Sequence, residues 1–83
     1  MGAKLKTLSG RELIAIFELF GFAAISQNGS HVKMRRVSVS GSETIIIPFH
    51  GKIPKGTLGA IFGQGARFIA KDDLYPHFHT SSR

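Results

Sequence analysis

The segment that starts at His31 combines a proton carrier with two cations at alternate positions. Lys33 and Arg35 follow the histidine at a spacing of two residues, and a turn-forming Gly29-Ser30 pair precedes it. Side chains along a β-strand point alternately to opposite faces. If this segment is a strand, the histidine and both cations share one face, and the apolar residues between them share the other.

This combination suits the cleavage of RNA. Cleavage without a metal requires that a 2′-hydroxyl lose its proton and that the leaving 5′-oxygen gain one. An unperturbed imidazole titrates near pH ~6.5, so it can take either part at neutral pH. A positioned acid or base contributes about 10²- to 10⁴-fold to a rate. His31 is therefore the candidate general acid or base, and Lys33 and Arg35 are candidates to hold the scissile phosphate.

Two further residues are candidates for the same chemistry. His50 could act as a second acid or base, and Ser30 could donate a hydrogen bond to the phosphate. Each of these residues could instead have a purely structural or surface role. His50 could instead bond the backbone of its own loop, Ser30 could serve only the turn, and the polar strand side chains could be solvated surface groups.

A helix is predicted to precede the first strand. Ser9 is a suitable N-cap and Glu12 follows three positions later, as in a capping box. Apolar residues then recur at helical spacing, and Gly21 is placed to end the helix. The helical apolar positions are Leu13, Ile16, Phe17 and Phe20. The pattern predicts a helix over residues 10–20.

Three strands are predicted next, over residues 22–27, 31–39 and 44–47. Asn28-Gly29 is a strong hairpin signal between the first two, and Pro48 ends the third. In the second strand Val37 and Val39 fall at the same parity as His31. The apolar residues thus change from the face opposite His31 to the face of His31 along the strand. This change predicts either a bulge at Arg35-Arg36 or a strand long enough to twist out of the sheet.

Two helices complete the predicted order. Residues 55–62 form the second helix in spite of three glycines, and Gly65 is a plausible stop. Residues 71–78 fit a short last helix, and residues 79–83 a frayed tail. The fold class is α+β, with the order α-β-β-β-α, a three-stranded antiparallel sheet and two helices packed on one face. Val32 and Met34 are then expected to face the helices.

Composition narrows the function classes. At 83 residues the chain is expected to be one domain over residues 1–83, with no cysteine for disulfides or thiolate-metal sites. No apolar run reaches the ~18 residues of a membrane span, and no signal-peptide pattern opens the sequence, so we expect a cytoplasmic protein. A net charge of +6 favours a polyanionic partner, whether nucleic acid, anionic membrane or acidic protein.

Several short motifs in a fixed order resemble the HicA (YcfA-like) toxins of bacterial toxin–antitoxin systems. The motifs are Ser9-Gly10-Arg11-Glu12-Leu13, Gly21-Phe22, Gln27-Asn28-Gly29-Ser30-His31, Ile47-Pro48-Phe49-His50 and Lys55-Gly56-Thr57-Leu58. Their order and spacing carry the similarity, which covers a core of about residues 8–65.

The resemblance implies a fold like the double-stranded-RNA-binding domain. It also implies a metal-independent endoribonuclease that cleaves mRNA and stops growth, and a HicB-like antitoxin that masks the active face. The catalytic histidine of the family corresponds to His31. Many members carry a second histidine directly after it, where this chain has Val32. Since strand parity places Val32 in the core, we expect little loss of activity.

Non-enzymatic functions are the alternatives. A non-catalytic RNA-binding module of the same fold would use Lys52 and Lys55 near the second helix, and Gly56-Thr57-Leu58-Gly59 matches the backbone clamp of KH domains. A pure protein-interaction domain is a third possibility. The closely spaced His77 and His79 lack defined ligand geometry, so neither metal nor cofactor is expected.

Overall fold

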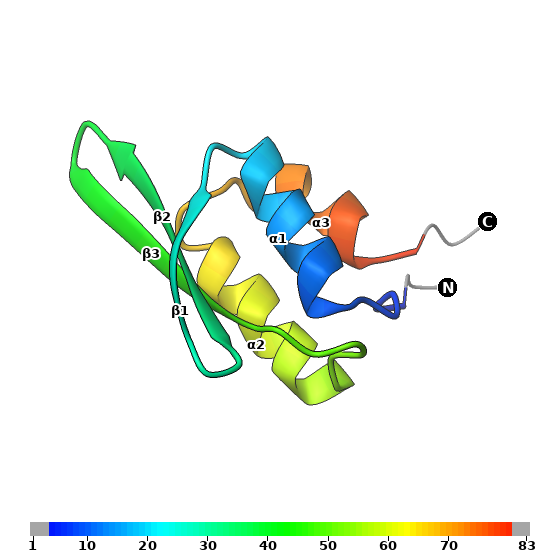
Figure 1. The fold of residues 1–83 in the computed structure, drawn as a ribbon. Coiled ribbons are helices and arrows are strands. Elements are labelled where there is room, and N and C mark those ends of the chain that lie inside the picture. Colours follow the sequence, from blue (N-terminus) through cyan, green and yellow to red (C-terminus); the bar gives the residue numbers. More distant parts are fainter. Residues whose placement is uncertain (1–3, 81–83) are drawn as a thin grey trace.

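The computed structural model describes residues 4–80, which form a three-stranded sheet covered on one face by helices (Figure 1). The α+β class and the α-β-β-β-α order are confirmed, and the short last helix is present. The elements are α1 (Gly10–Leu19), β1 (Ala23–Asn28), β2 (His31–Ser38), β3 (Gly41–Pro48), α2 (Lys55–Gly65) and α3 (Lys71–Phe78). No helix in this described part is long and apolar enough to cross a membrane.

Both ends of α1 are closed by the residues that the sequence indicates. The Glu12 amide donates to the Ser9 hydroxyl at 3.1 Å, and the Ser9 amide donates to the Glu12 carboxylate at 2.8 Å. Gly21 has a φ of +91°, which favours glycine. The Gly21 and Phe22 amides donate to the Glu18 and Phe17 carbonyls, as in a Schellman motif.

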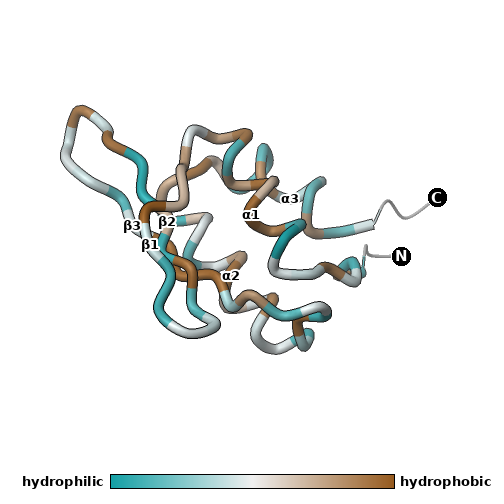
Figure 2. The backbone as a smooth tube through the Cα atoms, in the orientation of Figure 1, coloured by the Kyte–Doolittle hydropathy of each residue, from teal (hydrophilic) through white to brown (hydrophobic). Residues whose placement is uncertain are grey.

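The sheet is antiparallel with β2 in the centre. On its covered face Val32 and Met34 are buried, together with Ile45 and Ile47 of β3. The predicted assignment of faces along β2 is therefore confirmed. Figure 2 shows apolar stretches where the helices meet this face, and a further one at the tip of the β2–β3 hairpin.

Of the two alternatives predicted at Arg35-Arg36, the bulge is wrong. The β2–β3 register is continuous from His31 to Ser38, and the irregularity lies in β1, between Ala24 and Ser26. β1 ends its pairing at Arg35, so the rest of β2 pairs with β3 alone in a hairpin that extends past the helices (Figure 1). Val37 keeps the parity of His31 and is 77% exposed, because it lies on the open face of the sheet.

The core continues past Gly65 into α3. Leu74 and Phe78 are fully buried, and the Phe78 ring contacts the Phe17 ring with centroids 6.0 Å apart. A Cβ on Gly65 would lie 2.8 Å from side-chain atoms of Leu74 and Phe17, so this glycine permits the close packing of α1, α2 and α3. A Cβ on any other glycine of α2 would meet nothing within 4 Å, so those glycines serve no close contact. The burial of Leu58 and Ile61 against the core holds that helix.

The frayed tail predicted for residues 79–83 is wrong for its first two residues, and the other three lie outside the described residues. The Lys6 amide donates to the Phe78 carbonyl at 2.8 Å, and the Thr80 amide donates to the Lys4 carbonyl at 2.7 Å. The backbone groups before α1 and after α3 thus satisfy each other, which holds both segments in place.

The first turn of α1 lies directly against the end of β3. The Gly10 amide donates to the His50 carbonyl at 2.8 Å. A Cβ on Gly10 would lie 2.4 Å from the Pro48 carbonyl oxygen and 2.8 Å from the Phe49 Cα. Backbone atoms cannot rotate away as a side chain can, so only glycine allows this approach.

We predict that Gly10→Ala lowers the free energy of unfolding by about 1–3 kcal/mol through overpacking. Gly59→Ala is the matched control, because nothing lies within 4 Å of its new methyl group. It should raise stability by up to ~1 kcal/mol, as expected for alanine in a helix. Urea denaturation followed by circular dichroism measures both, and an equal effect of the two variants would contradict the close approach.

Candidate active site

A tight turn positions His31 at the start of β2. Asn28 pairs with His31, so Gly29 and Ser30 are the central turn residues rather than Asn28-Gly29. Gly29 has a φ of +62°, as the first central residue of a type II′ hairpin turn requires, and its carbonyl accepts a hydrogen bond from the Gln27 amide side chain. The turn thereby sets which face His31 occupies.

The open face of the sheet carries His31, Lys33 and Arg35 along its central strand, and all three are exposed. Residues opposite each other in an antiparallel pair lie on the same face. The neighbours of these three are therefore Asn28 and Pro48, Ser26 and Ile46, and Ala23 and Thr44. Since none of these neighbours is acidic, the two cations are not neutralised on this face.

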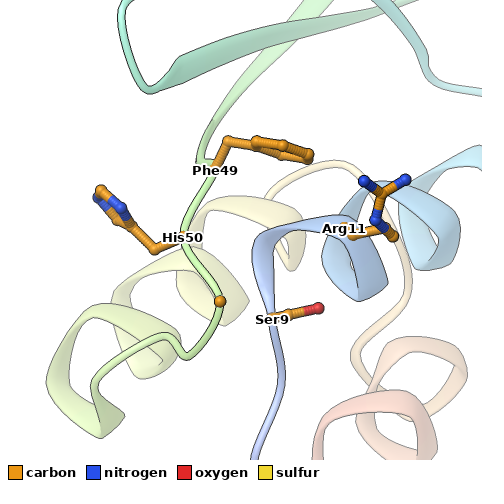
Figure 3. Close-up of a pocket in the computed structure, with 5 residues that line it drawn as sticks. Ser9, Arg11, Phe49 and His50 are labelled. Atoms are coloured by element: carbon orange, nitrogen blue, oxygen red, sulfur yellow. The ribbon is translucent and has the colours of Figure 1, made fainter.

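A hollow of about 220 Å³ lies beside the end of β3. It is lined by Ser9, Arg11, Phe49, His50 and Gly51. The Arg11 guanidinium carbon lies 5.5 Å from the Phe49 ring centroid. Figure 3 shows the Phe49 ring and the Arg11 guanidinium on the same side of the chain, and the His50 imidazole pointing away from them.

The backbone joins this hollow to the histidine strand. The Phe49 amide donates to the Ser30 carbonyl at 2.6 Å, which continues the β2–β3 pairing by one more bond. Pro48 pairs with His31, and His50 follows two residues later, after a turn in which its amide donates to the Pro48 carbonyl at 3.1 Å. The structure thus brings both predicted histidines to the same end of the sheet.

Comparison with family models supports the resemblance seen in the sequence. The model of the HicA toxin of bacterial toxin–antitoxin systems matches residues 10–66, which is more than half of the chain. The chain belongs to the HicA toxin family. Comparisons with curated proteins and with solved structures gave no significant match. A toxin of this family has a cognate antitoxin as its partner.

In this HicA toxin, Lys52 and Lys55 lie away from the open face. Lys52 is in the loop after β3, and Lys55 begins α2, which covers the opposite face. The Lys55 ammonium donates to the Leu5 carbonyl at 2.6 Å, so it fastens the segment before α1. The cations predicted to contact RNA therefore form two separate groups.

Arg36 is held by the fold, whereas its neighbour Arg35 is exposed. Its guanidinium donates to the Glu43 carboxylate at 2.7 Å and to the carbonyls of Phe20 and Phe68, both at 2.9 Å. It also lies 4.9 Å from the centroid of the Phe22 ring. This arginine therefore joins the end of α1, the sheet and the loop before α3.

Arg11 and Phe49 were not among the predicted site residues. They stand far apart in the sequence, and each has an ordinary explanation there, as a solvated residue in the first turn of a helix and as an apolar residue after a strand. Only the docking of α1 on the end of β3 brings them together. Arg11 follows the glycine that permits that docking.

We predict that Arg36→Gln lowers the free energy of unfolding by about 2–3 kcal/mol, because it removes hydrogen bonds to a charged group and leaves Glu43 without its partner. Arg35→Gln is the matched control and should change stability by less than ~0.5 kcal/mol, as for other surface substitutions. Unfolding curves in guanidinium chloride distinguish the two variants. Equal midpoints would mean that the Arg36 contacts do not stabilise the fold.

Proposed function

We propose that this HicA toxin is a metal-independent endoribonuclease that cleaves mRNA, and thereby inhibits translation and growth in the cytoplasm. The observation that carries the proposal is the exposed His31 next to two cations on a face where no acidic side chain neighbours them. His31 acts as the general acid or base, on the attacking 2′-hydroxyl or the leaving 5′-oxygen.

Lys33 and Arg35 have the charge to bind the scissile phosphate and to offset the charge that develops on it. Ser30 lies next to His31 in the turn and can donate its hydroxyl to the same group. Lys52 and Lys55 would contact phosphates further along the RNA strand. Lys55 would then exchange the Leu5 carbonyl for a phosphate oxygen.

His50 is the proposed second acid or base. It lies at the same end of the sheet as His31, and no hydrogen bond holds its imidazole within the described residues. Cleavage needs one group that accepts a proton and one that donates it, and two imidazoles can divide this work near neutral pH.

A HicB-like antitoxin would inhibit the toxin by covering the His31 face. An exposed basic face is attractive to an acidic surface, because complementary charges guide association. The antitoxin and the RNA would then compete for Lys33 and Arg35, so that one surface serves both catalysis and its control.

We predict that His31→Ala slows cleavage of single-stranded RNA by about 10²- to 10⁴-fold, because a positioned proton carrier is lost. The parent should cleave with EDTA present and arrest growth when expressed alone. His77→Ala, in α3 against Phe20, is the control and should behave like the parent.

If His31 and His50 act as a pair, the double variant His31→Ala/His50→Ala should cleave no more slowly than the slower of the two single variants.

Equal rates for His31→Ala and the parent would refute the assigned role of this histidine. RNA that is bound but stays intact with the parent would show instead a non-catalytic RNA-binding module.

Salt dependence tests the phosphate contacts separately from catalysis. In the His31→Ala background, we predict that Lys33→Gln and Arg35→Gln each reduce the slope of log affinity against log salt by about 0.7 for single-stranded RNA, because each loses one phosphate contact. Lys71→Gln, at the start of α3, should leave the slope unchanged. Fluorescence anisotropy at several salt concentrations gives the slopes, and identical slopes for all variants would rule out these contacts.

A further inference from the structure

We infer that the hollow lined by Arg11 and Phe49 is a nucleobase-binding subsite. In this assignment, the base of a nucleotide next to the phosphate at His31 stacks on the Phe49 ring, and Arg11 flanks it. The inference rests on the proposed function and deepens it, since it assigns the residues that bind a base of the RNA substrate.

Phe49 is exposed in a way that favours stacking. Its side chain is 37% exposed, whereas Phe17 and Phe78 are fully buried in the core. Its backbone is held by the bond to Ser30 and by contact with Gly10. The backbone that carries the ring is therefore held in place before a ligand binds. A base that covers the ring gains about the same contact whichever of the four bases it is.

Arg11 provides a cation at the same place. Its guanidinium lies 5.5 Å from the Phe49 ring centroid, and no carboxylate pairs with it within residues 4–80. Arginine planes stack on bases as aromatic rings do, and they also attract the phosphate backbone. An aromatic ring beside an unpaired arginine is thus suited to a nucleotide.

The size of the hollow limits the ligand. Its volume of about 220 Å³ is below the ~300–1,000 Å³ of sites that enclose a whole small molecule. A single base fits this description, with its ribose and phosphate outside. The hollow is also open, as the passage of an RNA strand requires.

The position of the hollow relates it to the catalytic histidine. Phe49 follows Pro48, which pairs with His31, and its amide bonds to the Ser30 carbonyl. The hollow and His31 therefore lie on two sides of the same end of the sheet. A strand whose phosphate is at His31 can pass around Ser30 and place its neighbouring base on Phe49.

A protein side chain is the rival occupant. An antitoxin could insert an apolar residue beside Phe49. The position next to His31 and the unpaired arginine favour RNA, because Arg11 attracts the phosphate backbone and would gain nothing from a purely apolar side chain.

The test compares RNA with and without bases. Fluorescein-labelled ten-nucleotide RNA and an abasic ribose-phosphate oligomer of the same length are titrated with His31→Ala protein, so that cleavage does not interfere. We expect Phe49→Leu to weaken binding of the RNA by about 5- to 150-fold, the range for one stacked base. Its effect on the abasic oligomer should be less than about 2-fold, because no base remains to stack.

Three control variants accompany this test. Phe49→Tyr keeps the ring and should bind like the parent. Lys33→Gln should weaken both oligomers equally, because it contacts phosphate. Tyr75→Leu removes an aromatic residue of similar exposure, 40%, on α3 and should weaken neither. Thermal unfolding of Phe49→Leu confirms that the variant is folded.

Equal loss on both oligomers, or no loss, would overturn the base subsite. Unchanged RNA affinity together with weaker antitoxin binding would assign the hollow to the antitoxin and also overturn it. These outcomes are separate from the proposed function. If the parent cleaves RNA but Phe49→Leu binds normally, only the subsite fails, and if base-dependent binding holds without cleavage by the parent, only the ribonuclease fails.

Discussion

The central position of β2 is the constraint on which the rest of the structure depends. From His31 to Arg35 this strand pairs on both sides, so these residues cannot rotate without breaking two ladders of hydrogen bonds. Val32 and Met34 are buried beneath the helices, and His31 and its two cations must then face outward. One register thus determines both the core and the face proposed to be catalytic, and a slip by a single residue would exchange them.

The two ends of the sheet are held by different kinds of contact. At one end Arg36 occupies the last covered position and joins three segments through hydrogen bonds and an aromatic ring. At the other end Gly10 brings the start of α1 against the backbone after β3. The contacts of Arg36 stabilise the hairpin where no helix covers it. The close packing at Gly10 forms the hollow next to His31.

The proposed chemistry divides between these surfaces. The open face supplies a proton carrier and positive charge, and the hollow supplies an exposed ring beside an arginine. Phosphate recognition and base recognition would then be independent, since different elements carry them. An RNA strand would meet both by passing around Ser30, whose carbonyl ties the two surfaces together.

The sequence by itself determined the local elements and the face of His31, because capping residues, glycines and two-residue alternation act over short distances. It predicted the order of elements and the burial of Val32. The bulge, one of its two alternatives for β2, lies in β1 instead, and Thr80, expected to fray, is hydrogen-bonded to Lys4. The role of Arg36 and the meeting of Arg11 with Phe49 were decided only by the tertiary structure. Each joins segments far apart in the chain, and such contacts depend on how helices dock rather than on local spacing.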